Sequence, residues 1–349
     1  MAECKESGKN LIFMISQPRA GSTLVQRTLG SHPDIHTMPE TWTMLNSLYA
    51  LKNEGYEAEY NSEWARLAVR DFLHRLPNGE SSYYEGVAKM HSYLYQLALE
   101  QSGKKIFLDK TPRYFHIIPE LHKTFPEATF IILFRNPLAV LCSMITTWIK
   151  GNEHWSHLSK YQADLLLAPS LLIEATKLIP SSQLIKVRYE DFISQPEKNI
   201  REICGALQIK YFPNLANYDS SERQGFGYSE QKKPVGNFGM PDAGNLSRWI
   251  NELEDPQTWR LVRDYLDMLG ETVISEMSYS YTEFSEIVYT RKPTKKQLRE
   301  AVPLQWLFKK PKGFLVGHYY LIRLHRSIRR MKMESIWLKM RLSIGIKTT

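Results

Sequence analysis

Residues 11–29 read Leu11-Ile-Phe-Met-Ile-Ser-Gln-Pro-Arg-Ala-Gly-Ser-Thr-Leu-Val-Gln-Arg-Thr-Leu29. The apolar run at the start, rich in isoleucine and bounded by polar residues, predicts a buried strand. Gly21 permits a tight turn, and the spacing of apolar residues after it predicts a helix over Ser22–Gly30. A helix N-terminus placed directly after a strand presents unpaired N–H groups and a positive dipole end to an anion. The stretch therefore predicts a strand, a phosphate-binding loop and a helix.

The loop of this unit carries side chains suited to a phosphate. Arg19 supplies a forked cationic donor, and the hydroxyls of Ser22 and Thr23 can donate to phosphate oxygens. The lysine and the first glycine of the GxxxxGK[ST] pattern are missing, so a metal-dependent nucleotide triphosphatase is not expected. An ordinary strand, turn and helix with an exposed arginine is the alternative. The expected phosphate contacts come from six consecutive residues: Arg19, Ala20, Gly21, Ser22, Thr23 and Leu24.

Short apolar runs alternate with stretches of helical periodicity along most of the chain. Such alternation predicts a mostly parallel sheet with helices on both faces. The fold class predicted is therefore α/β, with a P-loop-NTPase-like central parallel sheet. Besides residues 11–15, the predicted strands are Ile106–Leu108, Thr129–Phe134 and Leu184–Val187. The predicted helices cover Leu138–Lys150, Leu158–Leu178, Pro196–Leu207 and a stretch over residues 246–277, with a long loop over residues 211–245.

A second anion site is predicted at the end of the run Thr129–Phe134. The sequence continues as Arg135-Asn-Pro-Leu-Ala-Val-Leu-Cys-Ser143, in which Pro137 suits the first turn of a helix. Arg135 follows the carboxyl end of a predicted strand, where open α/β sheets bind their ligands. Taken singly, Arg135 also fits a surface ion pair, and Ser143 also fits a neutral helix position.

Charge is unevenly distributed along the 349 residues. The formal net charge is +8, but residues 291–349 hold sixteen Lys and Arg against two acidic residues, so residues 1–290 carry a net −6. The average charge therefore says nothing about the ligand of the main domain. The three cysteines are odd in number and widely separated, as is typical of reduced thiols. No cluster of Asp and His indicates a metal, and none is expected.

The two phosphate motifs together resemble those of a known family. Residues 17–24, QPRAGSTL, are similar to the 5′-phosphosulfate loop of sulfotransferases that use 3′-phosphoadenosine 5′-phosphosulfate (PAPS). Residues 135–144, RNPLAVLCSM, are similar to the 3′-phosphate motif of the same enzymes. The tyrosylprotein sulfotransferases are the most similar group, over roughly residues 10–275. Their pattern continues in His32-Pro-Asp34, Pro39-Glu-Thr41, Asp109-Lys-Thr-Pro112, Val187-Arg-Tyr-Glu190, Lys233-Pro-Val235 and Leu246-Ser-Arg-Trp249.

The resemblance implies roles for individual residues. Glu40 follows Arg19 by 21 residues, as the general base follows the loop arginine in the family, and would take the proton of the acceptor hydroxyl. Lys110 and Arg19 would stabilise the departing phosphate. Without the resemblance, Pro39-Glu40-Thr41 also fits the first turn of a helix. The implied co-substrate is PAPS and the product is PAP, held by Arg135 and Ser143 at the 3′-phosphate and further by Tyr189 and Lys233.

Two departures from the family pattern concern the acceptor. Trp42 stands where the tyrosylprotein enzymes usually have an arginine after Glu-Thr, and Thr147 replaces a further arginine. Because those arginines help to grip acidic peptides, the acceptor is open between a carbohydrate, a lipid, a phenol and a protein tyrosine. Five aromatic residues are expected either in an acceptor wall or in the core: Trp42, Tyr49, Tyr83, Tyr84 and Trp148.

The C-terminal region has a different composition. Residues 301–341 interleave aromatic and aliphatic residues with Lys and Arg, a pattern typical of an interfacial amphipathic helix. A helix packed on the domain and an oligomer contact are the alternatives. We predict a sulfotransferase domain over residues 1–290 and a basic, amphipathic, helical extension over residues 291–349. The extension would offer peripheral membrane contact, and no nucleic-acid partner is expected. The first apolar run is too short to direct export, so a cytoplasmic location is predicted.

The predicted function is transfer of the sulfuryl group from PAPS to a hydroxyl by in-line displacement. Two other functions remain open at this point. One is a membrane-tethered protein that binds a nucleotide without catalysing a reaction. The other is an ATP-dependent small-molecule kinase, which the missing P-loop lysine disfavours.

Overall fold

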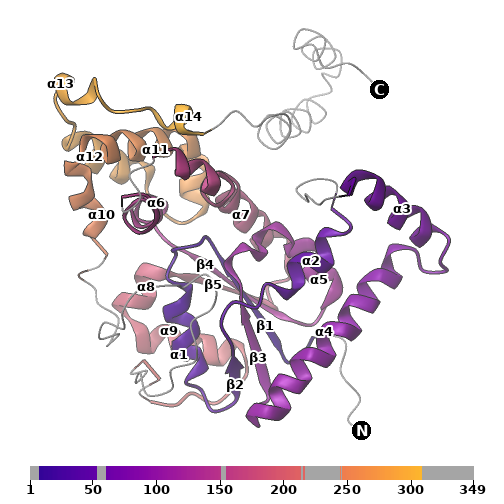
Figure 1. Cartoon of the computed structure of the whole chain (residues 1–349). Helices are drawn as coiled ribbons and strands as arrows, with labels where there is room; N and C mark the ends of the chain where they lie inside the picture. The colour runs from indigo at the N-terminus through magenta and orange to yellow at the C-terminus, as the bar shows by residue number, and fades with distance from the viewer. Residues whose placement is uncertain are drawn as a thin grey trace.

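The computed structural model describes residues 8–52, 60–150, 155–213, 215–216, 244 and 246–308. Its centre is a parallel sheet of five strands in the order β2-β3-β1-β4-β5 (Figure 1). The α/β class and the central parallel sheet predicted from the sequence are confirmed. The strands are β1 (Leu11–Ser16), β2 (Ile35–Thr37), β3 (Ile106–Lys110), β4 (Thr129–Phe134) and β5 (Leu184–Arg188).

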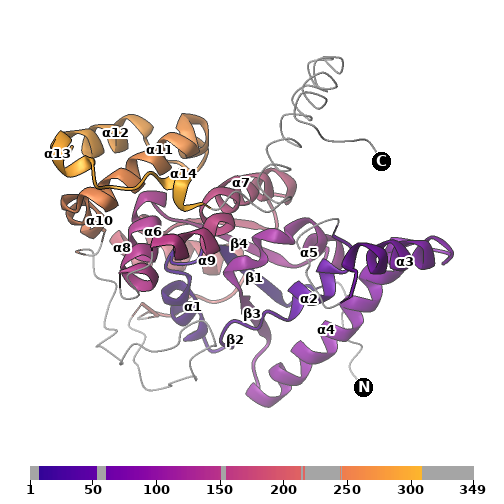
Figure 2. The same cartoon turned by 45° about the horizontal axis from the view of Figure 1, so that its top comes forward.

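The helices cover the sheet on both sides. Figures 1 and 2 show α1 and α9 on one face and α4 and α5 on the other. The helices up to β4 are α1 (Ser22–Gly30), α2 (Thr43–Tyr49), α3 (Ser62–His74), α4 (Glu80–Ser102), the 3₁₀-helix η1 (Pro112–His116) and α5 (Ile118–Thr124). Those between β4 and β5 are α6 (Pro137–Met144), the π-helix η2 (Ile145–Ile149), the 3₁₀-helix η3 (Trp155–Tyr161), the π-helix η4 (Ala163–Leu167) and α7 (Ala168–Leu178). After β5 come α8 (Tyr189–Ser194), α9 (Pro196–Ala206), α10 (Arg248–Asn251), the 3₁₀-helix η7 (Glu252–Glu254), α11 (Pro256–Glu276), α12 (Tyr281–Thr290), α13 (Lys295–Leu298) and α14 (Leu304–Leu307).

The core follows from the composition of the strands. Every residue of β1 is buried, because a parallel strand with helices on both faces has no solvent side. The ring of Phe13 in β1 contacts the rings of Phe125 and Phe130, and the ring centroids are 5.6 Å apart in both pairs. Tyr114 packs edge-on to Phe13 at 6.3 Å. This aromatic cluster holds the helices between β3 and β4 against the central strand.

The order of the strands decides where a ligand can bind. After β1 the chain passes β3's position to form β2, returns as β3 beside β1, and then crosses to β4 and β5 on the other side. A change of direction of this kind opens a crevice at the carboxyl ends of the strands, next to β1. Predicted site residues lie at or shortly after the carboxyl end of each strand: Arg19 after β1, Glu40 after β2, Lys110 at the end of β3, Arg135 after β4 and Tyr189 after β5. The topology therefore brings these residues to the same edge of the sheet.

Several elements differ from those predicted. β2 and the helices α2, α3, α4, α5, α8 and α12 were not predicted. The helix predicted over Leu158–Leu178 is divided into η3, η4 and α7, and the one predicted over Leu138–Lys150 changes from α6 to a π-helix at Ile145. Both π-helices insert an extra residue into the turn, which apolar periodicity does not reveal. Most of the loop predicted over residues 211–245 lies outside the described residues.

Residues 295–308 pack on α11. The amide of Gln257 on α11 donates to the carbonyl of Val302 at 2.9 Å, and the N–H of Val302 donates back to its Oε1 at 2.7 Å. Arg260 donates to the carbonyls of Leu298 and Ala301. The domain boundary at residue 290 stays a prediction, and residues 309–349 of the predicted extension lie outside the described residues. Among the described helices, none is both long enough and apolar enough to cross a membrane.

Candidate active site

The loop between β1 and α1 has a backbone that few residues can adopt. Gly21, the N-cap of α1, has φ of 89°, and Arg19 also has a positive φ of 68°. A Cβ at Gly21 would lie 2.2 Å from Cε2 of Tyr189, so only glycine fits between the loop and that ring. The loop thus places the first N–H groups of α1 at the carboxyl end of β1, as the sequence predicts for an anion site.

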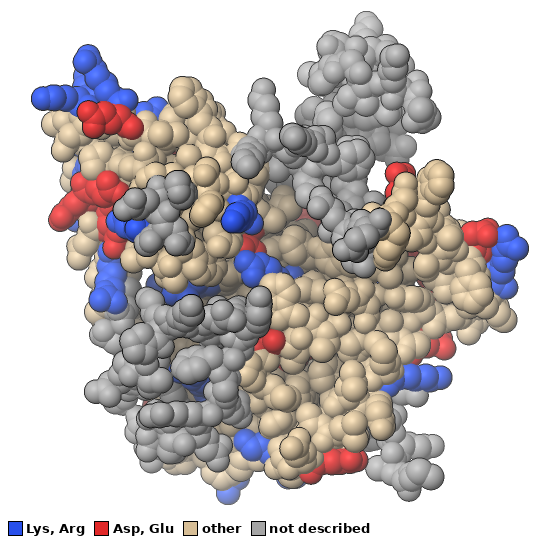
Figure 3. Space-filling view, viewed as in Figure 1, with Lys and Arg blue, Asp and Glu red and all other residues tan. Residues whose placement is uncertain are grey.

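The two predicted phosphate motifs are in direct contact. The guanidinium of Arg135 donates to the carbonyl of Arg19 at 2.8 Å and lies 4.6 Å from the ring centre of Tyr189. Nε of Arg19 donates to Oγ of Ser143, and a second guanidinium nitrogen donates to Oγ1 of Thr147, both at 3.2 Å. Figure 3 shows basic side chains gathered in a recess on this face of the molecule. Four of the predicted donor-binding residues therefore form one cluster with two guanidinium groups: Arg19, Arg135, Ser143 and Tyr189. We call it the cationic cluster.

Asn136 explains why α6 begins where it does. Its side-chain oxygen accepts from the backbone N–H groups of Leu138 and Ala139, and Pro137 occupies the first turn. The backbone N–H of Asn136 in turn donates to Glu190 at 2.9 Å. This cap fixes the direction of α6, and with it the position of Ser143 near the second turn.

Glu40 and Lys110 form a buried ion pair. Nζ of Lys110 lies 2.9 Å from Oε1 of Glu40, and the two side chains are only 1% and 10% exposed, respectively. Nζ also lies 3.5 Å from the hydroxyl of Thr23 in the phosphate loop. The lysine thus bridges the predicted base and the predicted phosphosulfate loop. Glu40 lies before the helix, because α2 begins at Thr43, so the reading of Pro39-Glu40-Thr41 as a first helical turn is wrong.

A fully buried carboxylate links the segments that carry these two residues. Asp109, which precedes Lys110, accepts hydrogen bonds from the hydroxyls of Tyr95 (2.7 Å), Thr41 (2.8 Å), Tyr114 (3.0 Å) and Thr111 (3.0 Å). Burial raises the pKa of Asp109, while the four hydroxyl donors oppose that rise. Because Thr41 follows Glu40, Asp109 ties the Glu40 segment to the end of β3.

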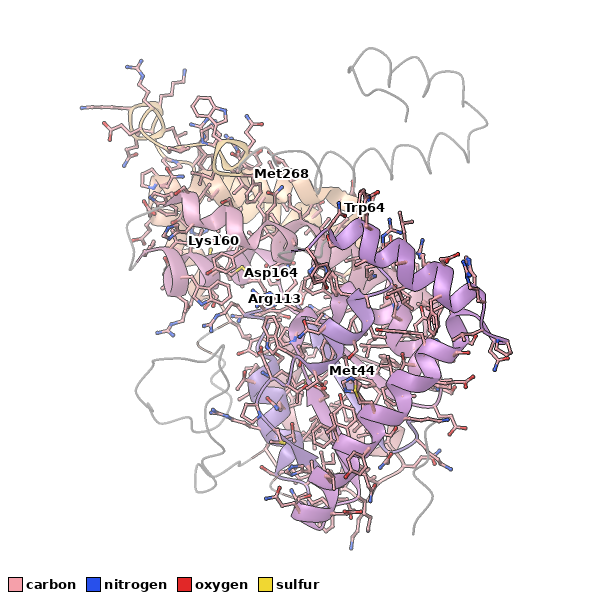
Figure 4. All side chains as sticks on the ribbon, turned by 45° about the vertical axis from the view of Figure 1, so that its right-hand side comes forward. Met44, Trp64, Arg113, Lys160, Asp164 and Met268 are labelled. Carbon is pink, nitrogen blue, oxygen red and sulfur yellow. The ribbon has the colours of Figure 1, made fainter. Side chains whose placement is uncertain are left out.

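A second buried carboxylate lies behind the site. Asp164 on η4 forms two hydrogen bonds with the guanidinium of Arg113 on η1, at 3.0 and 2.6 Å, and Figure 4 shows the two side chains pointing toward each other. Burial raises the pKa of Asp164; the charge of Arg113 lowers it, and the nearby carboxylate of Glu40 raises it further. The guanidinium of Arg113 lies 5.4 Å from the ring centre of Trp42, whose indole N–H donates to Oε2 of Glu40 at 3.1 Å.

The predicted aromatic residues divide into two groups. Trp42 contacts Glu40, and Trp148 lies 5.8 Å from the guanidinium of Arg19 and stacks on Tyr161 at 4.5 Å. The contacts of the other three are with residues outside the site. Those contacts join Tyr49 to His116, Tyr83 to the carbonyl of Ser47 and Tyr84 to Lys123.

The residues that support the site were not predicted from the sequence. Asp109 belongs to a quoted motif, but three of its four hydroxyl partners come from α4, η1 and the Glu40 segment, which only the fold brings together. Arg113 and Asp164 are 51 residues apart, and no local signal connects them. Lys233, predicted to bind the donor, lies outside the described residues. Within the residues that the structure describes, no three His, Cys, Asp or Glu side chains are grouped as a metal site requires.

Comparison with known proteins gives the family context of this site. A family model described as the sulfotransferase family matches residues 11–213, which confirms the resemblance found in the motifs. The nodulation protein NoeE of Sinorhizobium fredii is 27% identical over 297 residues, which cover 77% of this chain and 66% of that protein, just under two thirds of its length. A putative protein-tyrosine sulfotransferase of Caenorhabditis briggsae is 23% identical over 289 residues, which cover 78% of this chain and 93% of that protein. A solved sulfotransferase domain from the curacin biosynthetic pathway superposes with a TM-score of 0.47 at 18% identity, covering 68% of this chain and 89% of that domain.

Proposed function

We propose a donor and a course of reaction from one premise: this chain belongs to the sulfotransferase family. The proposed donor is PAPS, and the proposed acceptor is a hydroxyl group. The acceptor oxygen forms a bond to sulfur while the bond from sulfur to the bridging phosphate oxygen breaks. The acceptor proton passes to Glu40, and PAP leaves as the other product.

The observation that carries the donor assignment is the contact between the two anion motifs. Arg135 donates to the backbone of the phosphate loop, and Arg19 of that loop donates to Ser143. A ligand with a 5′-phosphosulfate on the loop and a 3′-phosphate near Arg135 and Ser143 would place two anions on this one cationic cluster. An adenosine nucleotide without the 3′-phosphate would leave half of the cluster unused. The tyrosine ring of Tyr189, which packs on Arg135, extends the same surface.

The ion pair of Glu40 and Lys110 supports the assignment of the chemistry. A hydroxyl that attacks sulfur needs a base on its own side, and the departing phosphate needs a cation on the opposite side. Lys110 lies between Glu40 and Thr23 of the phosphate loop, so it has access to the bridging oxygen of a nucleotide bound there. In this proposal Arg19 shares the stabilisation of the leaving phosphate, and no metal takes part.

The class of acceptor is open within the hydroxyl compounds. The proposed candidates are a carbohydrate, a lipid, a phenol and a protein tyrosine. Trp42 and Thr147 occupy the positions where tyrosylprotein enzymes usually carry arginines, and this favours an acceptor other than an acidic peptide. Trp148 and Tyr161 add a stacked aromatic pair beside Arg19.

The proposed function is tested by incubating the full chain with PAPS labelled in the sulfuryl group and a panel of the four acceptor classes. We expect label to pass to at least one class without added Mg²⁺. Glu40→Gln should lower turnover on that acceptor by about 10²–10⁴-fold and leave PAP affinity within twofold. Label transfer that persists at the wild-type rate in Glu40→Gln would refute the base assignment. Transfer from ATP that requires Mg²⁺, with none from PAPS, would indicate a kinase instead.

A further inference from the structure

The carboxylate of Glu40 is held at both of its oxygens. Oε1 accepts from Nζ of Lys110 at 2.9 Å, and Oε2 accepts from the indole N–H of Trp42 at 3.1 Å. Two donors on two different oxygens fix the plane of the carboxylate as well as its position. A base whose lone pairs point in a fixed direction loses less free energy to orientation during proton transfer.

The backbone of Trp42 is held in an unusual conformation. Its φ of 58° lies in the left-handed region, which is a genuine outlier for a bulky aromatic residue. Its carbonyl accepts from the N–H of Leu45 at 3.2 Å, so the residue forms the N-cap of α2. The preceding residue, Thr41, is fixed by its hydrogen bond to Asp109. Conformations of this kind persist only where the surroundings enforce them, and they concentrate at functional sites.

The ring of Trp42 is fixed from the other side. The guanidinium of Arg113 lies 5.4 Å from its centre, a cation–π contact. Arg113 itself donates two hydrogen bonds to the carboxylate of Asp164, whose side chain is 4% exposed. Because a bidentate pair fixes the plane of the guanidinium, the ring that lies against it has little freedom to turn. A chain of contacts therefore connects Asp164 on η4, Arg113 on η1 and Trp42 beside Glu40.

We propose that Trp42 is a positioning residue that orients the carboxylate of Glu40, and that Arg113 and Asp164 hold Trp42 in place. This inference rests on the proposed function, in which Glu40 is the base. This role differs from that of an aromatic residue that only binds the acceptor, because the indole N–H of Trp42 points at the carboxylate of Glu40. The arginine usually found at this position in tyrosylprotein enzymes has no aromatic face to place on Arg113.

The hydrogen bond is tested by the indole N–H resonances of the ¹⁵N-labelled full chain, which needs no acceptor. The Trp42 resonance is assigned by its loss in Trp42→Phe. We expect Glu40→Gln to shift this resonance more than that of any other tryptophan, because a charged acceptor is replaced by a neutral one. The exposed Trp306 gives the matched control, since its resonance should not move in Glu40→Gln. An unchanged Trp42 resonance would overturn the inference.

The role in catalysis is tested by Trp42→Phe with labelled PAPS and the acceptor found in the panel. Phenylalanine keeps a ring against Arg113 but lacks the N–H. We expect kcat to fall by about 10–100-fold, with the acceptor KM and the Kd of PAP unchanged. Trp306→Phe should retain wild-type kcat. A normal kcat in Trp42→Phe, or a change confined to the acceptor KM, would overturn the positioning role.

The two readouts separate this inference from the function on which it rests. If Glu40→Gln shifts the Trp42 resonance but the wild-type chain sulfates no acceptor, the proposed function is refuted, and the catalytic role of Trp42 with it. Full activity of Glu40→Gln refutes the base assignment while the hydrogen bond stands. Wild-type activity that is lost in Glu40→Gln but kept in Trp42→Phe refutes the positioning inference alone.

Discussion

For single residues, the buried ion pair of Glu40 and Lys110 has a direct consequence for stability. Removing one partner of a buried ion pair leaves an uncompensated charge. We expect Lys110→Met to lower the free energy of unfolding by about 3–5 kcal/mol in urea titrations. The matched control is Lys150→Met, whose partner Glu252 is 30% exposed, and this change should cost less than about 1 kcal/mol. Equal costs for the two variants would contradict the burial of the pair.

Gly21 gives a prediction about the phosphate loop itself. Gly21→Ala places a Cβ 2.2 Å from the ring of Tyr189 at a φ of 89°, so it combines overpacking with backbone strain. We expect a loss of about 1–3 kcal/mol in the free energy of unfolding and weaker PAP binding in calorimetry. Gly205→Ala, in an exposed helical position with open space around it, is the control. It should be neutral or stabilising by about 0.4–1 kcal/mol. A Gly21→Ala chain as stable as Gly205→Ala would show that the loop does not require glycine.

Which residues lie in the site was predictable where a local rule applies. Arg19 and Arg135 follow strands and Lys110 ends one, and the carboxyl ends of parallel strands meet at one edge of the sheet. The contacts of Trp42 were not predictable, because its backbone has a positive φ and its ring lies against Arg113, which Asp164 holds from a distant element. Thr147 was noted only as a missing arginine, whereas its hydroxyl accepts from Arg19.

Among the elements, the strands agree best with the pattern of the sequence. The prediction for β4 coincides with the structure at Thr129–Phe134, because a fully buried strand is one continuous apolar run. α4 was missed for the opposite reason, because its apolar positions do not lie on one face and large ones such as Met90 and Tyr93 are exposed. α3 does gather its apolar residues on one side, but Trp64 and Phe72 are exposed in the structure, and the stretch was not recognised as a helix. β2 has only three residues and offers too little pattern to recognise.

The attachment of residues 295–308 to α11 gives a prediction at this scale. Gln257 exchanges two hydrogen bonds with the backbone of Val302, and Asp264 accepts from the N–H of Leu304. Without its amide partner, the segment opens locally at a lower free energy than the core. We expect Gln257→Ala to raise the hydrogen-exchange rate of the Val302 amide by about tenfold, a loss of roughly one hydrogen bond. The exposed Glu271→Ala on the same helix should leave that rate unchanged. Equal exchange in both variants would argue against this attachment.

At the scale of the whole molecule, two histidines couple stability to pH. Burial lowers the pKa of His91 to about 4. Burial, with the charges of Lys52 and Arg113, lowers the pKa of His116 to about 4. Both would titrate near 6.5 in the unfolded chain, so unfolding takes up protons as the pH falls from about 6.5 to about 4. The stability that these two histidines contribute is therefore fully present above pH 6.5 and is lost as the pH falls toward 4.

The size of this effect is measurable by urea unfolding at pH 7, 6 and 5. Each histidine contributes up to about 1.4 kcal/mol per pH unit inside the window. Asp109 and Asp164 act in the opposite sense, because burial raises their pKa and favours the folded state at low pH. His91→Gln keeps a side chain that can hydrogen-bond the hydroxyl of Ser47, the partner of His91 at 3.0 Å, and should flatten the slope by about one proton. The same slope in the wild-type chain and in His91→Gln would contradict the burial of the His91 ring.

The donor site is tested by calorimetry with PAP and AMP, which differ in the 3′-phosphate. PAP and AMP are titrated into the full chain and into Arg135→Ala, with Arg201→Ala on α9 as the control arginine. PAP should bind wild-type at least tenfold more tightly than AMP, because the charged contacts to a 3′-phosphate are each worth about 1.5–3 kcal/mol. Arg135→Ala should remove most of that preference, and Arg201→Ala should retain it. Equal affinity of the wild-type chain for PAP and AMP would contradict the assignment of PAPS as the donor.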